Sequence, residues 1–502
     1  MRNEMKSYTE LERRFRRLSA LSDAASMLHW DSSVHMPAAA APARAEQLTE
    51  LKLVRHEILT ATDLADLIDE ACEETDGDSW RAANVTEMHR LRVHAAAVEP
   101  DLVAALTKKS SACEMIWREA RPANDFAAVV APLAEVVGLV RRMAEAKAEA
   151  LACSAYDALI DQFEPGARIG RIEAMFDDLV EFLPNFLDRV LERQGGEKPL
   201  LPLDGPFPIE AQRGLAHRLM EQLGFEFERG RLDISLHPFC GGVPEDIRIT
   251  TRYDEDDFAQ ALMGVIHETG HALYEMGLPK DWRRQPVGTA RGMALHESQS
   301  LLFEMQACRG PEFINFAAPL MREAFGVEGP AWQADNIQRH YRRVARSLIR
   351  VDADEVTYPL HVILRTRLER SIIADDLQIV DIPSAWCDGM AELIGVAPDD
   401  DTDGCLQDIH WFDGIFGYFP TYTMGALAAA QLFAAAKAAV PGLLDHIAEG
   451  DFAPLLSWLR ANVHEKASSA TTDELLAAAT GAPLSVAAFE AHLDARYLVP
   501  TG

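Results

Sequence analysis

The chain has 502 residues, of which 48% are hydrophobic and 25% are charged, a balance that is typical of folded globular proteins and excludes a disordered chain. Asp and Glu total 79 against 48 Lys and Arg, which gives a formal net charge of −31. An excess of negative charge this large repels phosphate backbones and anionic lipid surfaces, so we expect neither a nucleic acid nor a membrane as partner.

The cysteines and the apolar runs indicate a cytoplasmic protein. The seven cysteines are an odd number, are scattered along the chain and form no CxxC pair, which is typical of reduced thiols and argues against a cysteine-based zinc site. Residues 1–22 mix acidic with basic side chains and lack the apolar stretch of a signal peptide. The longest apolar run, 424–440, is interrupted by Gln431 and Lys437, which favours a buried helix over a membrane span.

The first part of the chain has the periodicity of helices. From residue 8 to about residue 151, apolar side chains recur at helical spacing and glycines are few. Further helical patterns cover 171–192 and 211–223, and the Gly- and Pro-rich segment 194–208 between them is the clearest break in the chain. We therefore predict a mainly α fold.

Residues 231–253 are the best candidates for strands. Apolar side chains alternate with others around Leu232 and again around Ile247 and Ile249, and a Gly-Gly turn lies between the two stretches. We predict a small antiparallel sheet there, with an edge that is able to pair with an extended chain. His237 lies on that edge, either as a contact to a bound molecule or as a half-buried structural histidine.

Residues 254–276 predict an amphipathic helix that carries a metal-binding motif. Its acidic first residues suit a helix N-terminus, and apolar side chains follow at helical spacing. The motif HExxH places His267 and His271 four positions apart on one face, so that two imidazoles can bind one metal ion. Glu268 is adjacent, where a carboxylate can take a proton from water held by the metal.

A third ligand is expected from the next helical pattern, at Glu297. It returns to the histidines if the two helices form an antiparallel hairpin through residues 277–288. The alternatives are that Glu297 lies in solvent or pairs with Arg291, or that His296 is the ligand instead. Neighbouring helical positions diverge by about 100°, so only one of the two faces the metal. Two histidines and a glutamate with an open fourth position form a hydrolytic zinc site.

Residues 338–353 are strongly basic for so acidic a chain. The segment contains Arg339, Arg342, Arg343, Arg346 and Arg350. Most of these side chains are expected on a solvated face. Arg350 is followed by acidic residues at 352 and 354, and a carboxylate there can orient it, so it is the best internal candidate for binding an anion.

A second candidate for catalytic residues is the segment 404–425, which is non-periodic and rich in glycine and aromatic residues. It contains His410, Tyr418 and Tyr422, and histidine and tyrosine are suitable donors to the oxyanion that forms on an attacked carbonyl. The alternative is an aromatic-rich loop of the core.

Taken together, these motifs resemble those of the thermostable, Taq-type metallocarboxypeptidases. The matching segments are HPF at 237–239, DxRxT at 246–250, HETGH at 267–271 with HESQ at 296–299, IRxxAD at 349–354, GxxQDxHW at 404–411 and YFPTY at 418–422. They occur in the order of the family and span most of the chain.

The resemblance implies a large helical metallopeptidase fold with a deep substrate cleft, similar to that of neurolysin. It also implies a homodimer with one divalent metal ion per chain, zinc or alternatively cobalt. We expect a single peptidase domain over residues 1–502, in which 1–200 form a helical cleft wall and lid and 201–502 carry the metal site.

The resemblance further implies the removal of single C-terminal residues from peptides with broad specificity. His267, His271 and Glu297 would be the metal ligands and Glu268 the general base. His410 and Tyr422 would stabilise the transition state, and Arg350 would bind the terminal carboxylate of the substrate, with His237 and Tyr418 as further substrate contacts.

Two other functions are open at this point. An oligoendopeptidase or dipeptidyl carboxypeptidase on the same scaffold would not need Arg350 as an anchor for the terminal carboxylate. A non-catalytic metal-containing binding protein would not need Glu268, because a structural site closes its fourth position.

Overall fold

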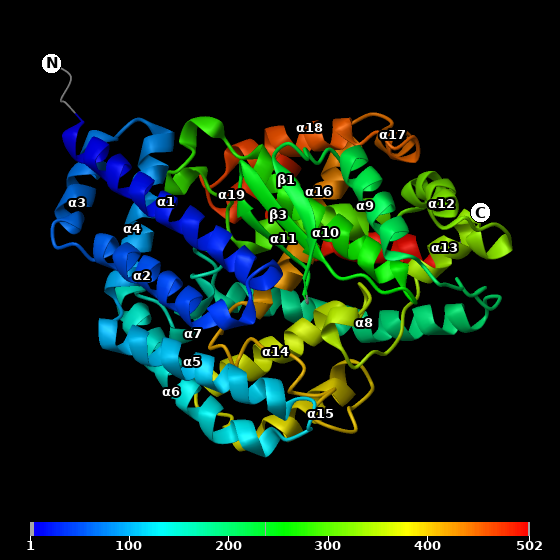
Figure 1. Cartoon of the computed structure of the whole chain (residues 1–502), viewed down its shortest axis with the longest axis horizontal. Helices are drawn as coiled ribbons and strands as arrows, with labels where there is room; N and C mark the ends of the chain where they lie inside the picture. The colour runs from blue at the N-terminus through cyan, green and yellow to red at the C-terminus, as the bar shows by residue number, and fades with distance from the viewer. Residues whose placement is uncertain (1–4, 236, 500–502) are drawn as a thin grey trace.

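The computed structural model describes residues 5–235 and 237–499, which form a mainly helical fold around one small sheet (Figure 1). The helices before the sheet are α1 (Lys6–Val34), α2 (Ala41–Leu59), α3 (Leu64–Glu74), α4 (Ser79–Ala96), α5 (Pro100–Ala120), α6 (Phe126–Leu151), α7 (Ala155–Ile160), α8 (Ile169–Gly195) and α9 (Ile209–Leu223). After it follow α10 (Phe258–Gly277), α11 (Met293–Leu301), α12 (Pro311–Phe325), α13 (Ala334–Tyr341), α14 (Tyr358–Ile373), α15 (Ile382–Leu393), α16 (Phe419–Ala439), α17 (Leu443–Ala448), α18 (Ala453–Asn462), α19 (Thr472–Thr480) and α20 (Ala487–Leu493). Two π-helical segments, η4 (Leu302–Cys308) and η9 (Asp494–Leu498), extend α11 and α20.

The sheet of the described residues has three strands and is mixed, which differs from the antiparallel pair expected from the sequence. Its strands are β1 (Gly230–Ile234), β2 (Phe239–Val243) and β3 (Asp246–Thr251), in the order β1-β3-β2. β1 pairs with β3 in parallel, from Gly230 opposite Ile247, and β2 pairs with β3 antiparallel. The Gly-Gly pair lies inside β2 and the tight turn falls at Pro244–Glu245, so the chain inserts β2 on the far side of β3.

The hydrophobic core is divided between the N-terminal helices and the rest of the molecule. One cluster of buried side chains belongs to α1, α3 and α4. A much larger cluster extends from Cys113 to Tyr497 and includes α10, α11 and α16. Figure 1 shows α1 to α4 along one side of the molecule, with α1 reaching across to the sheet, where Ser26 donates a hydrogen bond to the carbonyl of Gly242 in β2.

Helix α16 lies inside the molecule, as the alanine-rich run predicts. Most of its residues are buried, among them Gln431, which is satisfied by the carbonyl of Ala482 and the hydroxyl of Thr480. Small side chains allow close packing, and α16 packs along α11. Within the described part of the chain, no helix combines the length and the apolar character that crossing a membrane requires.

Candidate metal centre and active site

Two histidines and one glutamate lie close enough to hold a single metal ion. Helix α10 begins as predicted, with the Asp257 carboxylate accepting from the first free amides, and presents His267 and His271 one turn apart. Glu297 of α11 faces them, with its Oε2 3.7 Å from Nε2 of His267 and 3.3 Å from Nε2 of His271. One ligand atom of each residue lies within 4.8 Å of the other two, so the predicted group is assembled.

Glycine residues let the helices approach closely enough to form this group. A Cβ atom on Gly270 of α10 would lie 2.5 Å from the carbonyl oxygen of Gln299, which real atoms do not tolerate. On the other side of α11, a Cβ atom on Gly425 of α16 would lie 2.7 Å from Cβ of Glu297. The segment 297–300 of α11 is therefore held between α10 and α16 at contacts that only glycine permits.

The outer ring nitrogens of both histidines are held by acceptors. Nδ1 of His267 lies 2.9 Å from the Glu304 carboxylate, whose other oxygen accepts from Arg309 at 2.6 Å. Nδ1 of His271 lies 3.2 Å from the carbonyl oxygen of His296. Because these oxygens only accept, each Nδ1 donates, and Nε2 is the nitrogen of each ring that is placed to bind a cation. The later histidine of α10 contacts the earlier residue of the following helix: His267 contacts Glu304, and His271 contacts His296. The two helices therefore form the predicted antiparallel hairpin.

The electrostatics of this group fit a divalent cation. Burial lowers the pKa of His271 to about 4, so its imidazole is neutral near neutrality, the form that binds metals. Against the effect of burial, Glu297 and Glu304 raise the pKa of His267 to about 10. Carboxylates that hold a proton on this ring would equally stabilise a metal ion in its place.

Glu268 lies beside the ligands without being one of them. Its side chain is buried, and burial raises the pKa of its carboxyl to about 7, which suits a group that takes and returns a proton. Burial is the main cause of the raised pKa of Cys240 in β2, and the negative charges of Glu268 and Glu275 are the next largest causes. The edge strand of the sheet therefore lies beside the candidate base.

The start of α16 and the loop before it bring His410, Tyr418 and Tyr422 together. Nε2 of His410 lies 3.3 Å from the Tyr422 hydroxyl, and the rings of Tyr418 and Tyr422 lie 5.1 Å apart. Burial raises the pKa of Tyr422 to about 12 and lowers that of His410 to about 4, so near neutrality the phenol keeps its proton and the imidazole is neutral. Glu297 also raises the pKa of Tyr422, which places this hydroxyl on the metal side of α16.

Arg350 is buried in a cluster that contains one more arginine than it has carboxylates. Its guanidinium contacts Asp408 at 2.7 Å, and Arg365 contacts the other oxygen of the same carboxylate at 2.6 Å. Gln407 accepts from the backbone of Arg350 and from the Arg365 side chain. Cζ of Arg350 lies 5.1 Å from the centre of the Tyr422 ring, so the uncompensated positive charge is next to the candidate oxyanion donors.

The structure distinguishes between several alternatives left open by the sequence. Arg291 pairs with Glu87 at 2.5 Å rather than with Glu297, and Nε2 of His296 bonds Glu275 at 3.0 Å. Both therefore have partners outside the group of ligands. In the segment 404–425, Trp411, Phe412 and Phe416 are core residues, whereas His410, Tyr418 and Tyr422 contact one another.

One expectation about an individual residue is not met in the described structure, and one of two alternatives for another residue is excluded. Arg350 is oriented by Asp408 and not by the carboxylates close to it in the sequence. Asp354 instead accepts hydrogen bonds from the amides of Val356 and Thr357, just before α14. His237 is exposed just before β2, which excludes the half-buried structural histidine; its carbonyl accepts a hydrogen bond from the Ser235 hydroxyl.

Three residues of the site were missed from the sequence. They are Glu304, which holds His267, Arg365, which shares Asp408, and Tyr358, whose hydroxyl lies 3.2 Å from Arg350. Glu304 and Arg365 stand at helical positions with apolar neighbours, and a charged residue in such a place is a signal of a buried partner. Nothing in the local pattern distinguishes Tyr358 from an ordinary core tyrosine.

This fold and this arrangement are those of a helical metallopeptidase of the HExxH class: two histidines on one helix, a glutamate from the next, and a buried carboxyl beside them. Comparison with known proteins narrows the class. The family model described as Carboxypeptidase Taq (M32) metallopeptidase matches residues 10–497. The chain therefore belongs to this family of metallocarboxypeptidases, as the sequence motifs predicted.

Named relatives and solved structures agree over almost the full length of the chain. Thermostable carboxypeptidase 1 of Thermus thermophilus is 36% identical over 498 residues, which is 96% of each chain, and the protein of the same name from Pyrococcus furiosus is 32% identical over 97% of each. The structure of Trypanosoma cruzi metallocarboxypeptidase 1 has a TM-score of 0.96 at 39% identity and covers 98% of this chain and 100% of its own.

Proposed function

We propose that the chain is a zinc-dependent carboxypeptidase that removes single C-terminal residues from peptides with broad specificity. The observation that carries this proposal is the Arg350 cluster. It presents an uncompensated positive charge beside Tyr422, and Gly425, one turn further along the same helix, touches the ligand Glu297. A guanidinium at this place suits the free carboxylate of a peptide whose last carbonyl lies at the metal.

The three ligands would be His267, His271 and Glu297. Zinc is proposed as the metal from the family resemblance, with cobalt as the alternative, because a nitrogen and oxygen donor set by itself does not distinguish the two. Bound there, the ion would supply Lewis-acid chemistry to the scissile carbonyl and lower the pKa of water in its open position.

The other residues of the site would each have a separate catalytic or binding role. Glu268 would take a proton from the attacking water and return it to the departing amine. Tyr422 would donate its hydroxyl proton in a hydrogen bond to the oxyanion, with His410 holding that hydroxyl in place and Tyr418 packing against its ring. The free edge of β2 would pair with the backbone of the substrate, and His237, just before it, would contact residues further from the terminus.

We further propose that residues 1–502 work as one peptidase domain, in which residues 1–200 form the wall and lid of a deep, neurolysin-like cleft. The separate core of α1, α3 and α4 supports a part of the lid that moves as a unit. A cytoplasmic homodimer is proposed from the family resemblance, together with the reduced cysteines.

The experiment is a product analysis by mass spectrometry on a mixed set of peptides, each with a free or an amidated C-terminus. Zinc-loaded enzyme should shorten the free peptides one residue at a time and leave the amidated ones intact, and Glu268→Gln should do neither. Internal cuts, or removal of dipeptides, would replace the proposal by the endopeptidase or dipeptidyl carboxypeptidase reading. No cleavage by the wild type would favour a metal-containing binding protein.

A further inference from the structure

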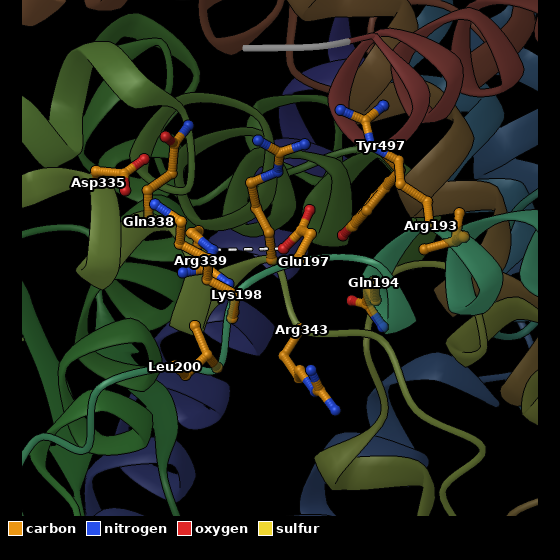
Figure 2. A pocket seen from close by; sticks show the side chains of 12 residues that line it. Arg193, Gln194, Glu197, Lys198, Leu200, Asp335, Gln338, Arg339, Arg343 and Tyr497 are labelled. Carbon is orange, nitrogen blue, oxygen red and sulfur yellow. Dashed lines mark hydrogen bonds and ion pairs between the residues drawn. The ribbon is translucent and has the colours of Figure 1, made fainter.

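A cavity of about 260 Å³ lies outside the active site, between the end of α8, the loop that follows it, α13 and the C-terminal turn (Figure 2). It shares no residue with the metal site or with the Arg350 cluster. Its volume is slightly below the roughly 300 Å³ at which pockets for drug-sized ligands begin, so it is suited to a small molecule. The Gln194 side chain bonds both the amide and the carbonyl of Val344 at 2.9 Å, which fixes the two walls to each other.

The lining of this cavity has a charge opposite to that of the chain as a whole. Its cations are Arg193, Lys198, Arg339, Arg342 and Arg343, and its anions are Glu197 and Asp335. The net charge of the lining is therefore positive in a chain whose total is −31. The cations come from α8, the loop after it and the region of α13, so that folding alone brings them together, at a cost in mutual repulsion.

Part of this positive charge is not matched by the protein. Glu197 pairs with Arg339 at 3.3 Å. Arg193 and Arg342 donate to the carbonyls of Val499 and Arg496, which orients both guanidinium groups without neutralising them. Lys198 and Arg343 form no ion pair within the described residues, and both line the cavity (Figure 2).

The amide of Gln338 also lines the cavity. The residue as a whole is 8% exposed, but its amide is open to the cavity and forms no hydrogen bond among the residues that the structure describes. An anion bound in the cavity can therefore accept a hydrogen bond from this amide. On the remaining side, Val190, Leu200 and the Tyr497 ring provide apolar surface.

We propose that this cavity is a binding site for a small anion that carries a phosphate or diphosphate group. Arg343, Lys198 and Arg342 bind its oxygens, the Gln338 amide donates a further hydrogen bond, and the apolar wall accommodates an organic part. The surface of the chain as a whole is acidic and repels an anion. Positive charges that converge in a concave site create a local positive potential, which attracts the anion to this cavity.

The test is isothermal titration of full-length, zinc-loaded protein with pyrophosphate, inorganic phosphate and glucose 6-phosphate, which separates an inorganic from an organic source of the group. We expect saturable binding of at least one, weakened by salt. The double substitution Lys198→Ala with Arg343→Ala should weaken it about tenfold or more, because each removes a charge-assisted contact. Gln338→Leu should weaken it several-fold while leaving every charge in place.

The matched control is Lys108→Ala with Arg142→Ala, which removes two exposed cations of α5 and α6 and should leave the affinity unchanged. Chelation of the metal by a phosphate would affect every one of these proteins equally, so the difference between them reports on the cavity. Absence of binding to the wild type, or equal affinity of the Lys198 and Arg343 variant and the wild type, would overturn the proposal.

Discussion

At the scale of single residues, the charge of the active site depends on two arginines that share one carboxylate. Against the effect of burial, Arg350 and Arg365 hold the pKa of Asp408 far below its usual range, so this carboxyl stays ionised. One aspartate cannot neutralise both guanidinium groups. One positive charge therefore remains unpaired in a buried site, which costs free energy. We infer that the anionic group of a bound substrate provides the missing partner.

We therefore predict that Arg350→Ala raises KM for peptides with a free C-terminus and lowers kcat/KM about 100-fold or more, the loss expected for truncating one partner of a buried charge pair. Asp408 keeps Arg365 as a partner, so the protein should still fold. Arg346→Ala, at a more exposed arginine of the same segment, is the control and should leave both constants unchanged. An equal loss on free and amidated peptides would show that Arg350 does not bind the terminal carboxylate.

Glu304 is not a metal ligand itself, but its carboxylate accepts a hydrogen bond from Nδ1 of the ligand His267 and so fixes the orientation of that ring. We predict that Glu304→Gln weakens zinc affinity by about 10- to 100-fold, the usual effect of losing a carboxylate behind a histidine ligand. Competition with a chromophoric chelator measures this. Glu323→Gln, on the surface of α12, provides the comparison, and an unchanged zinc affinity for Glu304→Gln would contradict the assigned role.

At the scale of elements, the metal site depends on how closely α11 lies against α10. Glu304 itself stands in the π-helical segment η4, where the wider turn shifts side chains relative to a regular helix, and such segments are frequent at functional sites. The hairpin between α10 and α11 was predictable, because the HExxH face needs a third ligand. The π-helical continuation was not, because its sequence is compatible with an ordinary helix.

Two glycines of α10 provide a matched test of this packing. Gly270→Ala places a methyl group against the backbone of α11 and should lower the free energy of unfolding by about 1–3 kcal/mol, with weaker zinc binding as α11 moves away. At Gly264 nothing lies within 4 Å of the new atom, so Gly264→Ala should stabilise the protein by about 0.5–1 kcal/mol through helix propensity. Urea titrations of both variants decide this; similar effects at the two positions would contradict the close packing.

At the scale of the whole molecule, the C-terminal end is attached to the segment before α14 through Glu355. This buried carboxylate contacts His492 at 2.9 Å, Arg496 at 3.0 Å and the Tyr497 hydroxyl at 2.8 Å. Against the effect of burial, Arg496 and His492 hold the pKa of Glu355 well below its usual range. A depressed folded-state pKa stabilises the native state above the unfolded value of about 4.3, and this contribution is lost as the pH falls below that value.

We predict that Glu355→Gln lowers the apparent free energy of unfolding near neutrality by about 3 kcal/mol, because Arg496 loses its buried partner. It should also make stability less dependent on pH between about 5 and 3, where the wild type loses this contribution. Urea unfolding across that range is the measurement. Glu449→Gln, at an exposed glutamate that ends α17, should behave as the wild type. A Glu355 variant with undiminished acid sensitivity would refute this account.

Local patterns in the sequence are sufficient for the class of fold, for α10 and for the pairing of His267 with His271, because helical periodicity alone decides which side chains share a face. They fail where a contact joins distant parts of the chain. Asp408, which pairs with Arg350, lies 58 positions away in the sequence, so no local pattern favours it over the carboxylates that are close to Arg350 in the sequence. The parallel pairing of β1 with β3, and the convergence of a basic segment with α8 into a cavity, depend likewise on which elements the tertiary fold places side by side.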